Sequence, residues 1–199
     1  MICCNGIMKA YGNYRVLKGI NATFADTGVY LLSGESGSGK TTFLNILYGL
    51  TSFDEGEVRV GDVSYSGHVD RRRMEKVTAY IPQDAMFVDF LSMRENLEMV
   101  NPDVSIIHRL CEIFDMNGLL QHFPKHLSGG ERQRFAIIRA LLFDRRILFM
   151  DEPTSAMDPV NKHKFMELMR ELKDSRLIIC ASHDNALEEE MNGVIRFLK

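Results

Sequence analysis

The sequence predicts an α/β fold built on a parallel sheet. Short, continuously apolar runs have the length and composition of buried strands, and segments with helical spacing alternate with them. This alternation is typical of a parallel sheet that is covered by helices on both faces. The strand-like runs lie at 29–32, 77–81, 147–150, 177–181 and 193–198, and the expected helices lie at 41–48, 130–143 and 159–172.

Two other regions differ from this alternation. The start of the chain is rich in expected strands, at 2–8, 20–24 and 57–60. Residues from about 90 to 125 have helical spacing without a clear strand, so they predict a helical insert and a second lobe.

Composition narrows the class of protein. Hydrophobic residues make up 45% of the 199 residues, and 27 acidic against 24 basic side chains give a net charge of −3. This balance argues against a dedicated nucleic-acid binder, which is usually basic. With no run of 18 apolar residues and no secretory signal, we expect no membrane-spanning helix in the chain. The four cysteines lack metal-ligand spacing, so we expect reduced thiols in a cytosolic protein.

A glycine-rich loop between an expected strand and an expected helix carries the strongest local motif. It matches the pattern G-x-x-x-x-G-K-[ST], whose backbone N–H groups and helix N-terminus bind a phosphate chain. Lys40 can reach the β- and γ-phosphates, and the Thr41 hydroxyl can ligate Mg²⁺. The members of this phosphate loop are Gly34, Glu35, Ser36, Gly37, Ser38, Gly39, Lys40, Thr41 and Thr42.

Two carboxylates follow the apolar run at 147–150. Ligands of parallel sheets bind at the carboxyl ends of the strands, which is where these side chains are expected. Asp151 is suited to hold Mg²⁺, and Glu152 can polarise an attacking water as a general base. Taken alone, the pair could equally be a solvated turn. The phosphate loop in the same chain favours the functional interpretation.

A second helix N-terminus that could bind a phosphate is expected at Ser128, Gly129 and Gly130. Ser128 and Glu131 have the spacing of a capping box, which opens a helix. The same N–H groups can also bind an anion. One chain would then have two helix N-termini that can bind an anion but only one phosphate loop. We therefore expect two copies to face each other head to tail, with each site formed between the phosphate loop of one copy and the second helix start of the other.

From Tyr11 to His183 the sequence resembles the ATP-binding cassette (ABC) family. Residues 127–133 are similar to its signature, and residues 155–158 are similar to its loop that crosses to the opposite site. The resemblance implies that Tyr11 stacks on adenine, that Gln83 contacts Mg²⁺ and the attacking water, and that His183 contacts the γ-phosphate. Without their order and spacing, these three would be an ordinary aromatic, a loop amide and a structural histidine.

The resemblance also implies the architecture. We expect a P-loop NTPase core with a mixed, mainly parallel sheet, an N-terminal antiparallel β subdomain and an inserted α-helical subdomain. All belong to one domain over 1–199, with a core lobe of about 1–82 and 129–199 and a helical lobe of about 83–128. Ser128 lies only 45 positions after Gln83, an interval that is short for the family and predicts a trimmed helical lobe.

The implied function is ATP hydrolysis with Mg²⁺ that powers a separate integral-membrane transporter subunit. Ser128, Gly129, Gly130 and Glu131 would complete the ATP site of a homodimer, or of a pseudo-symmetric dimer with a second cassette. We expect no nucleic-acid partner and a cytoplasmic location, peripheral on the inner face of the cell membrane. The motifs resemble the bacterial branch that exports macrolides, antimicrobial peptides and lipoproteins, so a peptide, drug or lipoprotein-like cargo is expected.

Two alternatives come from other classes. A soluble cassette acting on ribosomes would resemble proteins with two cassettes in one chain, and one acting on DNA would carry a long coiled coil; this sequence has neither feature. A nucleotide-binding regulator without turnover would commonly lack the base that Glu152 supplies.

The segment after Gln83 is unusually apolar for a loop and helix start. We expect its side chains at 86–93 to bind a short cytoplasmic helix of the membrane subunit, because Met and Phe suit an adaptable contact surface. The alternative is that they fill the core of the helical lobe.

Overall fold

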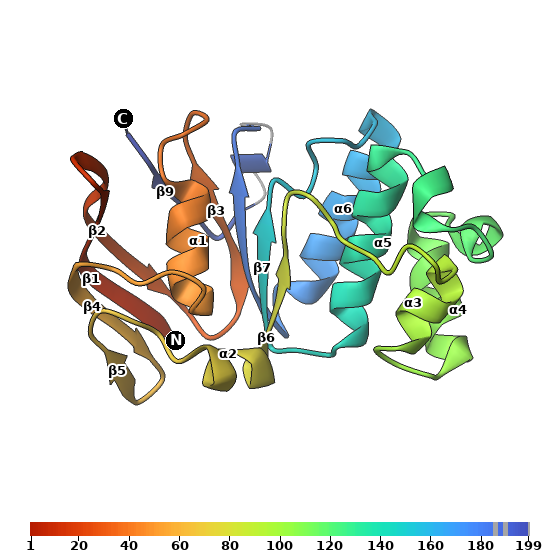
Figure 1. The fold of residues 1–199 in the computed structure, drawn as a ribbon, viewed down its shortest axis with the longest axis horizontal. Coiled ribbons are helices and arrows are strands. Elements are labelled where there is room, and N and C mark those ends of the chain that lie inside the picture. The colour runs from red at the N-terminus through yellow and green to blue at the C-terminus, as the bar shows by residue number, and fades with distance from the viewer. Residues whose placement is uncertain (185–186, 189–190, 199) are drawn as a thin grey trace.

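Two β-sheets organise the fold, with helix α1 between them (Figure 1). The computed structural model describes residues 1–184, 187–188 and 191–198. The first sheet is antiparallel, in the order β2-β1-β4-β5. Its strands are β1 (Ile2–Tyr11), β2 (Tyr14–Phe24), β4 (Glu55–Val60) and β5 (Val63–Tyr65).

The second sheet is parallel in every described pairing, in the order β6-β7-β8-β3-β9. This order places β3, β7 and β8 in the interior, with their carboxyl ends at one edge. Register pairs Ser33 with Ser182 and Asp151 with Ala181 at that edge. The strands are β3 (Gly28–Ser33), β6 (Thr78–Ile81), β7 (Ile147–Asp151), β8 (Leu177–Ser182) and β9 (Gly193–Arg196).

Helices cover both faces of the parallel sheet (Figure 1). Helix α1 lies on one face, and α5 and α6 lie on the other, with α3 and α4 beyond them. Short helix α2 leads directly into β6. The helices are α1 (Lys40–Tyr48), α2 (Arg71–Val77), α3 (Met93–Glu98), α4 (Val104–Ile113), α5 (Gly129–Leu142) and α6 (Pro159–Leu172).

The hydrophobic core divides at the parallel sheet. In β7, Leu148 and Met150 face the α5 side, whereas Phe149 faces the α1 side, and all three are fully buried. This is why the strand is continuously apolar: both of its faces are covered. The two core layers hold the carboxyl edge of the sheet in a fixed position relative to α1.

The predicted fold class is confirmed, with differences in detail. The expected sheet was mixed, but its described strand pairs are all parallel and the antiparallel strands form a sheet of their own. Helix α2 and strand β5 were not predicted, because α2 buries only Met74 and β5 has three residues. Strand β2 begins at Tyr14 rather than at residue 20, since its first half lacks apolar alternation: the half-buried Val16 and the buried Leu17 are adjacent. In the described parts of the chain, no helix has the length and apolarity needed to cross a membrane.

Candidate functional site

A cleft of about 750 Å³ opens at the carboxyl edge of the parallel sheet. The loop from β3 to α1 forms one wall, and residues that follow β6, β7 and β8 form the other. The lining residues are Val16, Ser33, Gly34, Glu35, Ser36, Gly37, Gly39, Lys40, Thr41, Thr42, Gln83, Glu152 and His183.

Glycine is required where the loop enters α1. Gly39 precedes the helix with φ of 104°, a left-handed conformation that L side chains rarely adopt. A Cβ there would also lie 2.8 Å from Leu17 Cδ2. No described side chain caps the first N–H groups of α1. The positive end of the helix therefore faces the cleft with hydrogen-bond donors available to an anion.

Lys40 places a positive charge in the cleft. Its side chain is 6% exposed, and its Nζ donates to the carbonyl oxygens of Gly34 at 2.7 Å and Glu35 at 3.1 Å. The carboxylate of Glu152 lies 3.8 Å away. A buried ammonium requires oxygen partners to offset its lost hydration, and the site supplies them on two sides.

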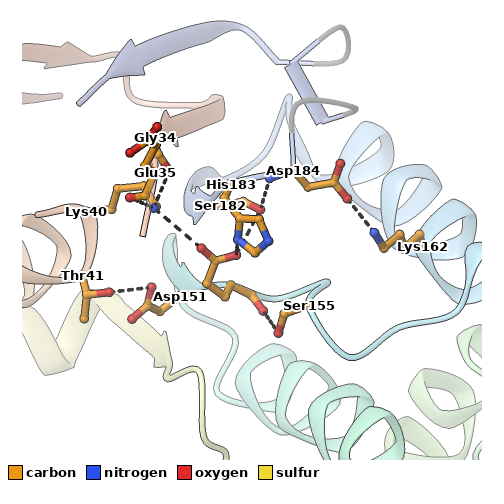
Figure 2. A network of polar contacts seen from close by, with 11 residues as sticks. Gly34, Glu35, Lys40, Thr41, Asp151, Ser155, Lys162, Ser182, His183 and Asp184 are labelled. Carbon is orange, nitrogen blue, oxygen red and sulfur yellow. Dashed lines mark hydrogen bonds and ion pairs between the residues drawn. The ribbon is translucent and has the colours of Figure 1, made fainter. Parts of the chain in front are cut away.

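The carboxylate at the end of β7 is joined to α1. The Thr41 hydroxyl donates to Asp151 Oδ1 at 3.1 Å, across 110 residues of sequence (Figure 2). Burial raises the pKa of Asp151 above its usual value, and the neighbouring Glu152 carboxylate adds to this. The Thr41 hydrogen bond and the Lys40 charge act in the opposite direction.

The second carboxylate, Glu152, is held by residues of the β8 end. Ser182 Oγ donates to Glu152 Oε2 at 3.2 Å, and His183 Nδ1 lies 3.0 Å from the same oxygen. The backbone of Glu152 has φ of 48°, and its N–H donates to Ala181 O at 2.8 Å. A left-handed conformation at a non-glycine residue costs about 1–2 kcal/mol, so tertiary contacts fix this position.

The structure brings most of the predicted site residues together, and it places others elsewhere. Gln83 and His183 line the same cleft as the phosphate loop. Ser38 lies behind the lining, 5% exposed, and its hydroxyl has no hydrogen-bond partner among the described residues. Tyr11 is 53% exposed on the β1–β2 hairpin, and within the described part of the chain it is not among the lining residues.

The predicted signature residues lie at the start of α5, outside this cleft as its described lining defines it. Ser128 and Glu131 form the expected capping box, with both reciprocal hydrogen bonds present. Gly130 permits a close approach to the loop after β7, since a Cβ there would lie 2.5 Å from Ala156 O. The motif therefore has a structural role within its own chain: it begins α5 and packs against the loop after β7.

Sequence reasoning missed three residues of the site. Val16 and Ser33 line the cleft, and Ser182 orients Glu152. Ser182 directly precedes His183 at the end of a buried strand, a position that could have signalled it. Val16 reaches the site only through the pairing of β2 with β1, for which the sequence has no local signal.

The oxygen donors of the site suit magnesium. Mg²⁺ prefers carboxylate and hydroxyl oxygens, and it usually takes only one or two ligands from the protein. Thr41 and Asp151 supply one hydroxyl and one carboxylate in contact with each other. In the described residues no group of three or more His, Cys, Asp or Glu side chains is placed to hold a metal by itself, so phosphate oxygens and water would have to complete the shell.

Comparison with known proteins identifies the family. The family model described as ABC transporter matches residues 17–155. HrtA of Staphylococcus aureus, which is named as a hemin import ATP-binding protein, is 35% identical to this chain over 206 residues. The match covers 95% of this chain and 93% of HrtA. Human ATP-binding cassette sub-family A member 10 is 31% identical over 185 residues and covers 87% of this chain, which spans only 12% of that longer relative.

The fold comparison agrees. The ATP-binding cassette MJ0796, solved as a dimer in a post-hydrolysis state with ADP and Pi, has a TM-score of 0.86 and 26% identity. The match covers 99% of this chain and 94% of that one. With its phosphate loop, its paired carboxylates and these matches in sequence and fold, the chain belongs to the ABC transporter family.

Proposed function

We propose that this chain binds and hydrolyses ATP with Mg²⁺ and thereby drives transport through a separate integral-membrane subunit. The observation that carries the proposal is the convergence of Lys40, the Thr41–Asp151 pair and Glu152 on one cleft. Phosphoryl transfer needs a cation on the phosphates, oxygen ligands for a metal and a group that orients water. All three are present at the carboxyl edge of one sheet.

Each residue has a distinct role in this proposal. Lys40 and the N-terminus of α1 bind the phosphate chain, and Thr41, Asp151 and Gln83 hold Mg²⁺, which would neutralise phosphate charge when bound. Glu152 accepts the proton of the attacking water as general base. Ser182 and His183 fix the orientation of the Glu152 carboxylate, and His183 also faces the cleft that would receive the γ-phosphate.

We further propose that the signature completes the ATP site of a second copy. The α5 start lies outside the described lining of its own chain's cleft, and N–H groups at a helix start that a capping box does not use can bind an anion from another molecule. A two-fold, head-to-tail dimer would place each signature opposite a partner's phosphate loop. The MJ0796 cassette, which has the same fold, was solved as a dimer, and this supports the pairing of two copies.

The membrane subunit would bind the segment that follows Gln83, within a helical lobe of about 83–128. Met86 and Phe90 are 80% and 81% exposed, and exposed apolar side chains that gather in one patch are typical of a protein contact surface. Beside them a hollow of about 380 Å³ is lined in part by Val88, Met99 and Phe143. Met93, in contrast, is fully buried, so the apolar segment is part docking surface and part core.

Direction and cargo are proposed from the sequence motifs. The motifs resemble the exporter branch, whereas HrtA is named for hemin import. We propose that the transporter exports a peptide, drug or lipoprotein-like substrate. The present chain would lie on the cytoplasmic face of the membrane, bound to the membrane subunit. Transport assays in inside-out vesicles decide this, because an exporter accumulates cargo inside such vesicles and an importer does not.

Replacing the proposed base tests the chemistry. Glu152→Gln keeps the shape and the hydrogen bond from Ser182 but removes the proton acceptor. We expect ATP binding to persist and turnover to fall by about 10²–10⁴ in a steady-state phosphate-release assay. Wild-type turnover in this variant would refute the role of Glu152, and no hydrolysis by the wild type with its membrane partner would refute the whole proposal.

The composite site is tested by oligomeric state. Glu152→Gln with ATP should elute from gel filtration as a dimer, because the bound nucleotide is not consumed. Adding Ser128→Arg places a bulky charge where the partner's phosphate would lie, so the dimer should be lost. Ser175→Arg, in the exposed turn between α6 and β8, is the matched control that should still dimerise. Equal dimerisation of the Ser128→Arg variant would contradict the head-to-tail arrangement.

Crosslinking tests the membrane contact. In a background without the four native cysteines, single cysteines at Met86 and Phe90 should crosslink to the membrane subunit in an ATP-sensitive way. A cysteine at Val160, which is 66% exposed on α6, is the matched control and should not react. Absence of crosslinks at both test positions while transport is intact would place the docking surface elsewhere.

A further inference from the structure

A buried lysine lies at the end of β1, two residues before Tyr11. Lys9 is 8% exposed, and its Nζ lies 3.2 Å from Asp54 Oδ1 and 3.4 Å from Ser52 Oγ. The same ammonium lies 5.3 Å from the centroid of the Tyr11 ring, within the range of a cation–π contact. Lysine is rarely buried without partners, so this position is held by specific interactions.

Asp54 joins this lysine to the strand that carries Tyr11. Its Oδ2 accepts the N–H of Ala10 at 2.7 Å, next to a register shift between Lys9 and Ala10 in the pairing of β1 with β2. The Ala10 N–H and the Lys9 side chain together hold the pKa of Asp54 below its usual value. One carboxylate thus fixes both the irregular backbone and the cation beside the ring.

The hairpin that bears Tyr11 lies next to the phosphate loop. Val16, on β2, lines the cleft, and a Cβ at Gly39 would lie 3.1 Å from Val16 Cγ1. The hairpin and the loop into α1 lie at the same upper edge of the view in Figure 1. Tyr11 pairs with Tyr14 at the hairpin end and remains 53% exposed.

We propose that Lys9 and Asp54 are positioning residues that hold the Tyr11 ring ready to stack on the base of the nucleotide. The inference rests on the proposed function, which assigns the cleft to ATP. An exposed tyrosine would otherwise sample several rotamers and lose that freedom when the base binds. Holding the ring beforehand lowers this cost, which is the general advantage of a preorganised site.

A purely structural role for Lys9 makes a different prediction. If Lys9 only stabilised the hairpin, its loss would disturb the neighbouring phosphate loop through Val16 and weaken every phosphate ligand. If it acts through Tyr11, only ligands with a base should be affected. ADP and inorganic tripolyphosphate distinguish these cases, because both bear phosphates and only ADP has a base.

The experiment compares Lys9→Met, Lys9→Arg and Lys18→Met by calorimetric titration with ADP and with tripolyphosphate. Lys18 is an exposed lysine on β2, so its variant controls for the lost charge. We expect Lys9→Met to raise the Kd for ADP about two- to tenfold, which corresponds to the cost of ordering one side chain. Tripolyphosphate binding should be unchanged, and Lys9→Arg should restore ADP affinity.

A double-mutant cycle with Tyr11→Leu closes the test. In the Tyr11→Leu background, Lys9→Met should have no further effect on ADP affinity. An unchanged Kd in Lys9→Met, a parallel loss of tripolyphosphate binding, or full additivity with Tyr11→Leu would overturn the proposal. If Lys9→Met does not fold, Lys9→Gln carries the same comparison. Failure of the wild type to bind tripolyphosphate would instead count against the ATP site itself.

Discussion

The buried ammonium of Lys40 is the interaction on which the rest of the site depends. The Lys40 side chain is only 6% exposed, so its ammonium needs oxygen atoms around it. The fold supplies two loop carbonyls and the Glu152 carboxylate. These partners come from both walls of the cleft. The same charge attracts phosphate and also holds the proposed base close to the place where phosphate would bind.

This constraint explains why the strand order matters. Lys40 and Thr41 follow β3, whereas Asp151 ends β7 and Glu152 follows it, and β8 lies between these two strands in the sheet. Only a parallel arrangement brings the carboxyl ends of all three to one edge. The buried apolar layers on both faces of β7 keep those ends in register, and the left-handed backbone of Glu152 turns its side chain toward Ser182 and His183.

The sequence predicted those parts of the fold and site that are encoded locally. The phosphate loop and the two carboxylates at the end of β7 each occupy consecutive positions with clear chemistry, and the buried strands are continuously apolar. Val16 and the Lys9–Asp54 pair could not be predicted this way, because their positions arise from strand pairing between distant segments. The apolar residues after Gln83 were ambiguous for another reason: spacing alone does not separate exposed Phe90 from buried Met93.

Binding of ATP to a Lys40→Met variant tests the central claim most directly. Methionine retains the length of the side chain but not its charge, so calorimetric titration isolates the contribution of the ammonium. Hydrogen bonds to charged groups contribute about 1.5–3 kcal/mol, so the account predicts an affinity at least about tenfold lower than that of the wild type. The exposed Lys173→Met variant should bind as the wild type does. Equal affinity of the Lys40→Met variant and the wild type would contradict the account.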